Sequence, residues 1–194
     1  MRAAFAGGGS ITATIYTVTV LVWVAIELRQ ALRRRPGATI TDQGSLMVVR
    51  VAALAGALLA AALARIGATS FDYGPALMVS SIALMWTGIA LRWWSFRTLG
   101  RYFTFQVMTS ADQPVITTGP YRYLRHPSYT GILLILAGIG LGYGNLLSLV
   151  ALIVLPLLGF INRIRVEEAA LSATLGDRYT TYATGRKRLV PFVW

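Results

Sequence analysis

Two short polar segments hold the residues of this chain that could do chemistry. One contains the only histidine of the sequence, His126, directly after Arg125. The other is the run R-I-R-V-E-E, in which a spacing of four residues places Arg163 and Glu167 on one face of a helix, one turn apart. An arginine can form paired hydrogen bonds with a ligand carboxylate, and a glutamate can hold a ligand cation. We therefore predict that the two segments form two walls of one binding site.

Each segment also has a simpler explanation. A single interfacial histidine is more often a satisfied hydrogen-bonding group than a catalyst, and Arg163 with Glu167 could be an ordinary ion pair beside a membrane span. The positions of the segments favour a site, because ionisable residues at the depth of the membrane boundary are functional candidates. The sequence has no cysteine, which excludes a thiolate metal site, and with one histidine we predict no metal.

The composition is that of an integral membrane protein. Of the 194 residues, 56% are hydrophobic and 13% are charged, whereas charged residues make up about a quarter of an ordinary soluble domain. The formal net charge of +11 would suggest a nucleic-acid partner in a soluble chain. Here the basic residues fall between apolar runs, so the charge reports membrane topology and no nucleic-acid partner is predicted.

Five apolar runs predict an all-α membrane protein with five transmembrane helices, since a helix needs about 20 residues to cross a bilayer. The last two runs are short and are separated by a turn at residues 142–145, so we expect a tight helical hairpin. Arg92, Trp93 and Trp94 are predicted to anchor the end of the third run at the interface. The five runs are Ile11 to Ile26, Leu46 to Ala64, Pro75 to Trp94, His126 to Leu141 and Leu146 to Ile161.

The C-terminal part is polar enough to lie outside the membrane. We expect a helix from Arg163 to Leu175, Gly176 as its C-cap and a second short helix, which together complete the site. The glycine-rich end of the fourth apolar run could suggest a nucleotide-binding loop, but no strand precedes it. Gly138 and Gly142 instead predict close helix packing in lipid.

The positive charges predict an orientation. Of the 18 Lys and Arg residues, all but Arg2 and Arg65 fall in segments that five spans place on one side. By the positive-inside rule this side is cytoplasmic, which puts the N-terminus outside and the C-terminus with the site inside. We divide the chain into an N-terminal three-span membrane region, residues 1–100, and a cofactor-binding and catalytic region, residues 101–194.

The sequence resembles a known family through three motifs in order. These are G-P-Y-R-Y-L-R-H-P-S-Y-T-G from Gly119, R-x-x-x-E-E from Arg163 and L-G-D-R-Y-x-x-Y from Leu175. Together they resemble the isoprenylcysteine carboxyl methyltransferase family of integral membrane enzymes, over residues 106–192. The resemblance implies an S-adenosylmethionine site without a Rossmann domain, built between the last two spans and the C-terminal segment. The three N-terminal spans match only in being apolar.

By position, the resemblance implies which residues contact the ligands. The family's substrate-contacting arginine, which we also predict to be catalytic, falls on Arg163. Glu167 is a suitable partner for the sulfonium or ammonium group of S-adenosylmethionine, and a tyrosine ring can favour a cation or stack on adenine. The predicted cofactor contacts are Gln106, Gln113, Pro114, Val115, Ile116, Tyr121, His126, Pro127, Ser128, Tyr129 and Glu167.

The function implied is an S-adenosylmethionine-dependent methyltransferase acting on a lipophilic or prenylated substrate that enters from the bilayer. The carboxylate of a prenylated cysteine is the first candidate, with a related isoprenoid or lipid next, and membrane lipids are further partners. The oligomeric state stays open, and a monomer is compatible with the sequence. One alternative is an NADPH-dependent membrane reductase of the sterol or steroid reductase type, although those enzymes tend to carry a glutamate where this chain has Ile132. Another is a non-catalytic basic scaffold that binds anionic lipid.

Overall fold

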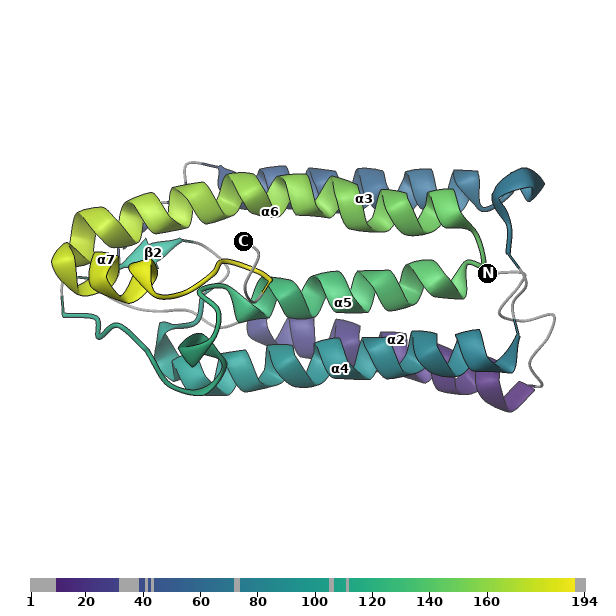
Figure 1. Ribbon diagram of the computed structural model, residues 1–194, viewed down its shortest axis with the longest axis horizontal. Coiled ribbons are helices and arrows are strands. Elements are labelled where there is room, and N and C mark those ends of the chain that lie inside the picture. The colour runs from purple at the N-terminus through teal and green to yellow at the C-terminus, as the bar shows by residue number, and fades with distance from the viewer. Residues whose placement is uncertain are drawn as a thin grey trace.

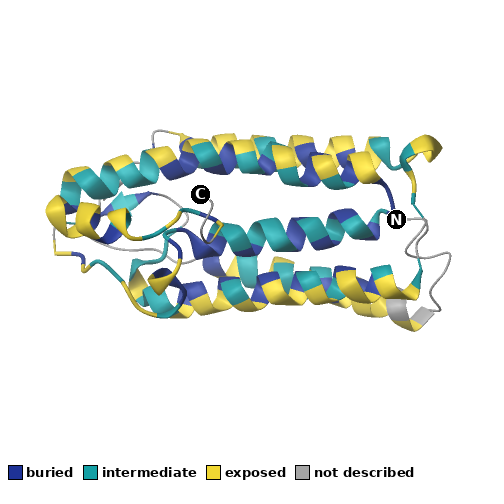
Figure 2. Cartoon of the chain, viewed as in Figure 1, coloured by how far each residue is buried: buried dark blue, intermediate teal, exposed yellow. Residues whose placement is uncertain are grey.

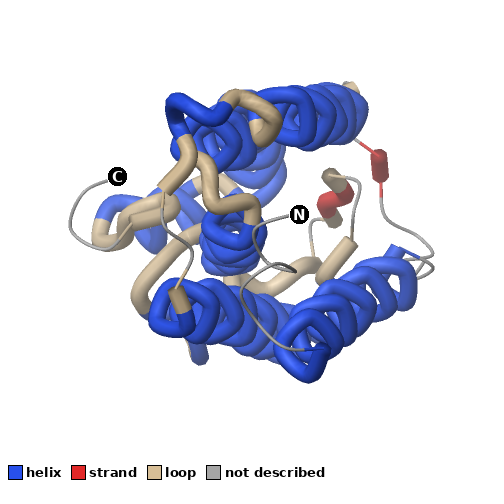
Figure 3. The backbone as a smooth tube through the Cα atoms, turned by 90° about the vertical axis from the view of Figure 1, so that its right-hand side faces the viewer, coloured by secondary structure: helices blue, strands red, loops and turns tan. Residues whose placement is uncertain are grey.

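The computed structural model describes residues 10–31, 39–40, 42, 44–71, 74–104, 107–110 and 112–190. In these ranges the chain is predominantly α-helical, as the sequence predicts. The view along the bundle shows helices side by side, with strands confined to the connecting segments (Figure 3). The helices are α2 (Ser10–Ala31), α3 (Ser45–Leu63), α4 (Pro75–Leu99), α5 (Pro127–Gly142), α6 (Leu146–Leu175) and α7 (Asp177–Thr184), with short 3-10 turns η1 (Gly67–Thr69), η2 (Gly100–Tyr102) and η3 (Gly119–Arg122).

Three segments are long and apolar enough to cross a membrane, namely Ser45–Leu63, Pro75–Tyr102 and Leu146–Leu175. Their outward faces carry large apolar side chains, such as Leu58 of α3 and Leu158 of α6, which are 64% and 57% exposed. Helices that present apolar residues outward as well as inward are typical of membrane spans. The prediction of a multi-pass membrane protein is therefore confirmed.

The shorter apolar helix α5, with 16 residues, lies at the centre of the bundle. Figure 1 shows α5 running beside α4 and α6 running beside α3. None of the α5 residues is exposed (Figure 2). A helix that is enclosed by protein can be shorter than a lipid-facing span because its ends meet protein groups rather than hydrocarbon. The predicted hairpin is present, since α5 and α6 are antiparallel neighbours joined by residues 143–145.

Helix α6, which carries the last predicted span, is longer than predicted. We expected the span to end near Ile161 and a separate helix to begin at Arg163, but α6 runs without interruption to Leu175. Neither glycine nor proline follows Gly159 before the end of α6, so nothing in the sequence breaks the helix where its apolar run ends. Gly176 then stops the helix with a φ of 54°, and its N–H donates to the carbonyl of Ser172, which confirms the predicted C-cap.

Glycines set the distance between α4 and α5. A Cβ atom added at Gly88 would lie 2.5 Å from the carbonyl oxygen of Gly131, and one at Gly138 would lie 2.7 Å from that of Ser81. The Ser81 hydroxyl also donates to the carbonyl of Gly138 at 2.7 Å. The backbones touch because these positions lack side chains. This confirms the packing role predicted for Gly138, and Gly142 likewise packs against Tyr16 of α2.

Two features of the structure, one in the connecting loops and one between helices, were not predicted. Strand β1 (Thr39–Ile40) pairs antiparallel with β2 (Met108–Thr109), which joins the loop before α3 to the loop after α4. Arg92, predicted to anchor α4 at the interface, is instead 2% exposed and forms an ion pair with Glu27 of α2. Arg92 faces the neighbouring helices, whereas the next two residues on α4 are the exposed tryptophans that the sequence predicted.

Candidate active site

His126 lies directly before the first turn of α5 and is held there by the C-terminal segment. Its backbone N–H donates to the carbonyl of Arg188 at 3.0 Å, and the N–H of Arg125 donates to that of Lys187 at 2.8 Å. Pro127 follows as the first residue of α5, a position where its missing N–H costs no helix bond. The segment after α7 thus folds back along residues 125–126, which fixes the histidine at the end of the hairpin opposite its turn.

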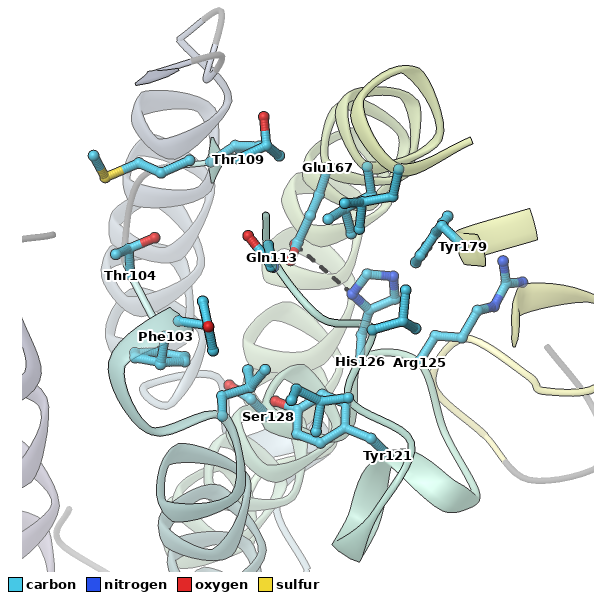
Figure 4. Close-up of a pocket in the computed structure, with 18 of the residues that line it drawn as sticks. Phe103, Thr104, Thr109, Gln113, Tyr121, Arg125, His126, Ser128, Glu167 and Tyr179 are labelled. Carbon is cyan, nitrogen blue, oxygen red and sulfur yellow. Dashed lines mark ion pairs between the residues drawn. The ribbon is translucent and has the colours of Figure 1, made fainter. Parts of the chain in front are cut away.

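The His126 ring lies between two carboxylates of α6. Nε2 is 3.1 Å from Oε1 of Glu168, and Nδ1 is 3.7 Å from Oε2 of Glu167 (Figure 4). Glu168 is also paired with Arg125 and Arg188, each at 2.9 Å, so that carboxylate ties the C-terminal segment to α6. The structure brings together the two polar segments that the sequence predicted as two walls of a site. No group of three or more metal-ligating side chains occurs among the residues described.

Tyr129 joins Arg163 to Glu167. Nε of Arg163 donates to the Tyr129 hydroxyl at 2.9 Å, and that hydroxyl donates to Oε2 of Glu167 at 2.8 Å. The Tyr129 ring stacks between the rings of His126 and Phe160, with centroids 5.6 and 5.0 Å away. The ordinary ion pair considered for Arg163 and Glu167 is thus replaced by a link through a tyrosine whose ring stacks on two neighbouring rings.

These side chains line a cavity closed by α7 and by the loop that follows α4. The predicted site residues on its wall are Gln113, Pro114, Val115, Ile116, Tyr121, His126, Ser128, Tyr129, Arg163 and Glu167. Pro127 does not line the cavity, because as the buried first residue of α5 it packs inside the protein. Gln106 lies outside the described residues.

The sequence did not assign several further wall residues to the site. Tyr179 and Tyr182 of α7 are buried, and the Tyr182 hydroxyl donates to the carbonyl of Tyr121 at 2.9 Å. Their spacing of three residues on a short helix was the available signal. Burial raises the pKa of Tyr182 to about 12 and also raises the pKa values of Tyr121 and Tyr179, so these rings are neutral at physiological pH. The other wall residues that the sequence did not assign to the site are Leu99, Tyr102, Phe103, Thr104, Val107, Met108, Thr109, Arg125, Leu171 and Leu175.

Residues 81–173 match the isoprenylcysteine carboxyl methyltransferase (ICMT) family. The matched range contains both polar segments, with Tyr129, Arg163 and Glu167 between them. The part of the chain that holds the candidate site is therefore similar to this family. It is 34% identical over 108 residues to protein-S-isoprenylcysteine O-methyltransferase B of Arabidopsis thaliana, which covers 55% of each protein. It is 30% identical over 122 residues to protein-S-isoprenylcysteine O-methyltransferase of Schizosaccharomyces pombe, covering 56% of this chain and 50% of the relative.

The chain spans about half the length of the curated ICMT relatives it matches. Its fold is also similar to the solved structure of the eukaryotic intramembrane Ras methyltransferase ICMT, with a TM-score of 0.65 at 20% sequence identity. That similarity covers 95% of this chain and 69% of the other. The ICMT-like fold therefore extends over the N-terminal spans, where the sequence alone showed only shared apolar character.

A second, mostly apolar cavity meets the first. The two cavities share five wall residues. Arg92 lies on the wall of the apolar cavity and donates from Nη1 to the Ser128 hydroxyl at 2.7 Å, while Glu27 neutralises the guanidinium. Sequence reasoning missed this buried pair. The shared residues are Phe103, Thr104, Ser128, Tyr129 and Arg163.

Proposed function

We propose that this chain transfers a methyl group from S-adenosylmethionine to a lipophilic acceptor, in the first place the carboxylate of a prenylated cysteine. The names of its relatives state this chemistry for them, as protein-S-isoprenylcysteine O-methyltransferases. The observation that carries the proposal is the junction of the two cavities at Tyr129 and Arg163. A methyltransferase for lipids needs a polar donor site and an apolar acceptor site that meet at one point.

The polar cavity fits S-adenosylmethionine by the chemistry of its wall. The Glu167 side chain is 30% exposed and offers a carboxylate to a sulfonium or ammonium group. Neutral tyrosine faces at Tyr121 and Tyr179 can favour a cation or stack on adenine. Gln113, from the loop after α4, adds a polar side chain that can both donate and accept hydrogen bonds. We assign the remaining predicted contacts, Gln106 among them, to the same donor site.

The apolar cavity fits the hydrocarbon part of the acceptor. Its wall includes Leu28 from α2, Val49 from α3 and Phe160 from α6. Burial of a prenyl chain against such side chains is favourable by about 25 cal/mol per Å² of apolar surface. Arg163 lies where this wall ends, so a carboxylate at the end of a bound lipid would reach the guanidinium.

The chemistry proposed needs no base. When bound, S-adenosylmethionine supplies a methyl group on a positively charged sulfur, and a carboxylate oxygen forms the new C–O bond as the C–S bond breaks and its electron pair stays on sulfur. A carboxylate is already ionised near neutral pH, so no proton has to be removed. Arg163 orients the acceptor, and Tyr129 fixes Arg163. Catalysis then comes from positioning and from the exclusion of water by the surrounding helices.

We also propose five spans, with the N-terminus outside and the site at the cytoplasmic face. Besides the three long apolar segments, α2 has 22 residues, which at 1.5 Å per residue gives about 33 Å, enough to cross a hydrocarbon core. The enclosed α5 would be the fifth span. The concentration of basic residues on the side of the site supports the orientation.

Calorimetry and a turnover assay test the proposed function. The purified protein in detergent is titrated with S-adenosylhomocysteine and, separately, with NADPH, and turnover is measured with N-acetyl-S-farnesylcysteine. We expect S-adenosylhomocysteine to bind and NADPH to give no heat. Glu167→Gln should weaken the binding of S-adenosylhomocysteine about tenfold. The control is Arg165→Gln, at an exposed position on the same helix, which should leave this affinity unchanged. Binding of NADPH alone would contradict the proposal and favour a reductase.

A further inference from the structure

The guanidinium of Arg163 already has a carboxylate partner inside the protein. Nη1 lies 3.3 Å from Oδ1 and 3.4 Å from Oδ2 of Asp42, in the loop before α3. Ser45 completes the contact, since its hydroxyl accepts from the same nitrogen at 2.9 Å and donates to Asp42. Arg163 is 4% exposed and Asp42 is 7% exposed. A second carboxylate that approaches Arg163 from the apolar cavity would therefore meet a resident negative charge.

Asp42 is held in place by the start of α3. Its carboxylate accepts the N–H of Leu46 at 3.0 Å, and its carbonyl accepts the N–H of Ser45 at 2.8 Å. Burial raises the pKa of Asp42, but the hydrogen bond from Ser45 and the charge of Arg163 outweigh burial and bring the pKa below its ordinary value. Asp42 is thus ionised at neutral pH, and its charge stays beside Arg163.

The change of charge on the acceptor during the proposed reaction suggests a role for the contact between Arg163 and Asp42. In the transition state the acceptor carboxylate loses negative charge as its oxygen bonds to carbon, and the ester product is neutral. An arginine that bound the ionised acceptor at full strength would stabilise the ground state more than the transition state. A nearby carboxylate raises the energy of the charged acceptor and has little effect on the neutral ester.

We propose that Asp42 is a positioning residue that competes with the acceptor carboxylate for Arg163 and so sets how strongly this site binds a charged acceptor relative to its ester. The inference rests on the proposed function. Asp42 lies outside residues 81–173, so this control comes from a part of the chain that the family match does not cover. The same loop carries β1, whose partner β2 contributes Met108 and Thr109 to the polar cavity.

The test replaces the charge and keeps the helix cap. Asp42→Asn and Asp42→Ser both retain a side-chain oxygen that can cap α3. We measure kcat and KM for N-acetyl-S-farnesylcysteine and the inhibition constant of its methyl ester. The KM for the carboxylate should fall about tenfold and kcat should also fall, because like-charge repulsion is removed from the ground state. Inhibition by the ester should change less than about twofold. Asp42→Glu should restore wild-type values, and Asp177→Asn on the exposed start of α7 is the matched control.

The outcomes separate two failures. If the variants raise KM for the acceptor, leave it unchanged, or shift acceptor and ester together, Asp42 only maintains the shape around Arg163 and this inference is wrong, while the methyltransferase proposal stands. If the wild-type protein neither binds S-adenosylhomocysteine nor methylates the acceptor, the proposed function fails and the inference fails with it. Thermal unfolding with and without acceptor adds a readout independent of turnover. A larger acceptor-induced stabilisation in Asp42→Asn than in the wild type supports competition.

Discussion

The guanidinium of Arg163 and the carboxylate of Glu167 share one hydroxyl, that of Tyr129. The tyrosine oxygen accepts from Nε of the arginine at 2.9 Å and donates to Oε2 of the glutamate at 2.8 Å. In the proposed enzyme Arg163 contacts the acceptor and Glu167 contacts the methyl donor. Tyr129 would then set the distance between the two reactants, a role that neither charged residue can fill alone.

Tyr129→Phe tests this link. The change keeps the ring between His126 and Phe160 but leaves a buried donor and a carboxylate without their shared partner, which costs about 1–3 kcal/mol. We expect kcat/KM to fall about 10- to 100-fold, with a smaller loss of S-adenosylhomocysteine affinity. Steady-state kinetics and calorimetry measure the two effects. Tyr123→Phe, at a ring that is 62% exposed, is the control, and wild-type kinetics in Tyr129→Phe would contradict the proposed link.

Arg163→Ala tests the acceptor contact. Loss of a buried charged partner commonly costs 30-fold or more, so we expect turnover to fall about 100-fold or more. The proposed nucleoside contacts lie elsewhere on the cavity wall, so S-adenosylhomocysteine affinity should stay within about threefold of wild type. The matched control is Arg165→Ala, at an exposed position on the same helix. Full activity of Arg163→Ala on the true acceptor would show that another residue orients it.

Gly88→Ala tests the close approach of α4 and α5. The added methyl group would lie 2.5 Å from a backbone oxygen, which cannot move without shifting a helix. We expect destabilisation of about 1–3 kcal/mol, visible as a lower unfolding temperature. Gly67→Ala is the control, because a Cβ atom there meets nothing within 4 Å. Equal unfolding temperatures for the two variants would mean that the helices adjust freely.

The pair between Asp42 and Arg163 predicts a pH dependence of stability. The pKa of Asp42 in the folded protein lies below its ordinary value of 3.8, so the unfolded chain binds a proton at a higher pH than the folded one. The stabilisation is therefore fully present only well above the unfolded-state pKa, and it is lost as the pH falls through the folded pKa. Thermal unfolding at pH 7 should separate wild type from Asp42→Asn more widely than at acid pH. A constant difference across this range would contradict the assignment.

The contact between His126 and Glu167 could be predicted from the sequence alone. Two apolar runs joined by a short turn place the start of the first helix and the end of the second at the same end of a hairpin, and the structure has that arrangement. The uninterrupted course of α6 could not be read in this way, since the apolar pattern stops near Ile161 while helix propensity continues. The hydrophobic pattern indicates which part of a helix lies in an apolar environment, but it does not predict the residue at which the helix ends.

The carboxylates of Glu27 and Asp42 were beyond sequence reasoning for another reason. Each pairs with an arginine far along the chain, at separations of 65 and 121 residues. A charged residue at a membrane boundary shows a need for a partner without showing which one. The pairing of β1 with β2 is similar, because two residues are too few to display the alternation that marks a strand.

The pairing of Glu27 with Arg92 also has a consequence for how the protein is made. A lone carboxylate or guanidinium within a span resists insertion into lipid, and each of these helices supplies one. Because α2 is synthesised before α4, the proposed span α2 reaches its lowest energy only after α4 has entered the bilayer beside it. Arg92→Leu should leave α2 incompletely integrated while the three long apolar spans keep the protein in the membrane. Protease treatment of newly made membranes would detect this as increased cleavage within α2.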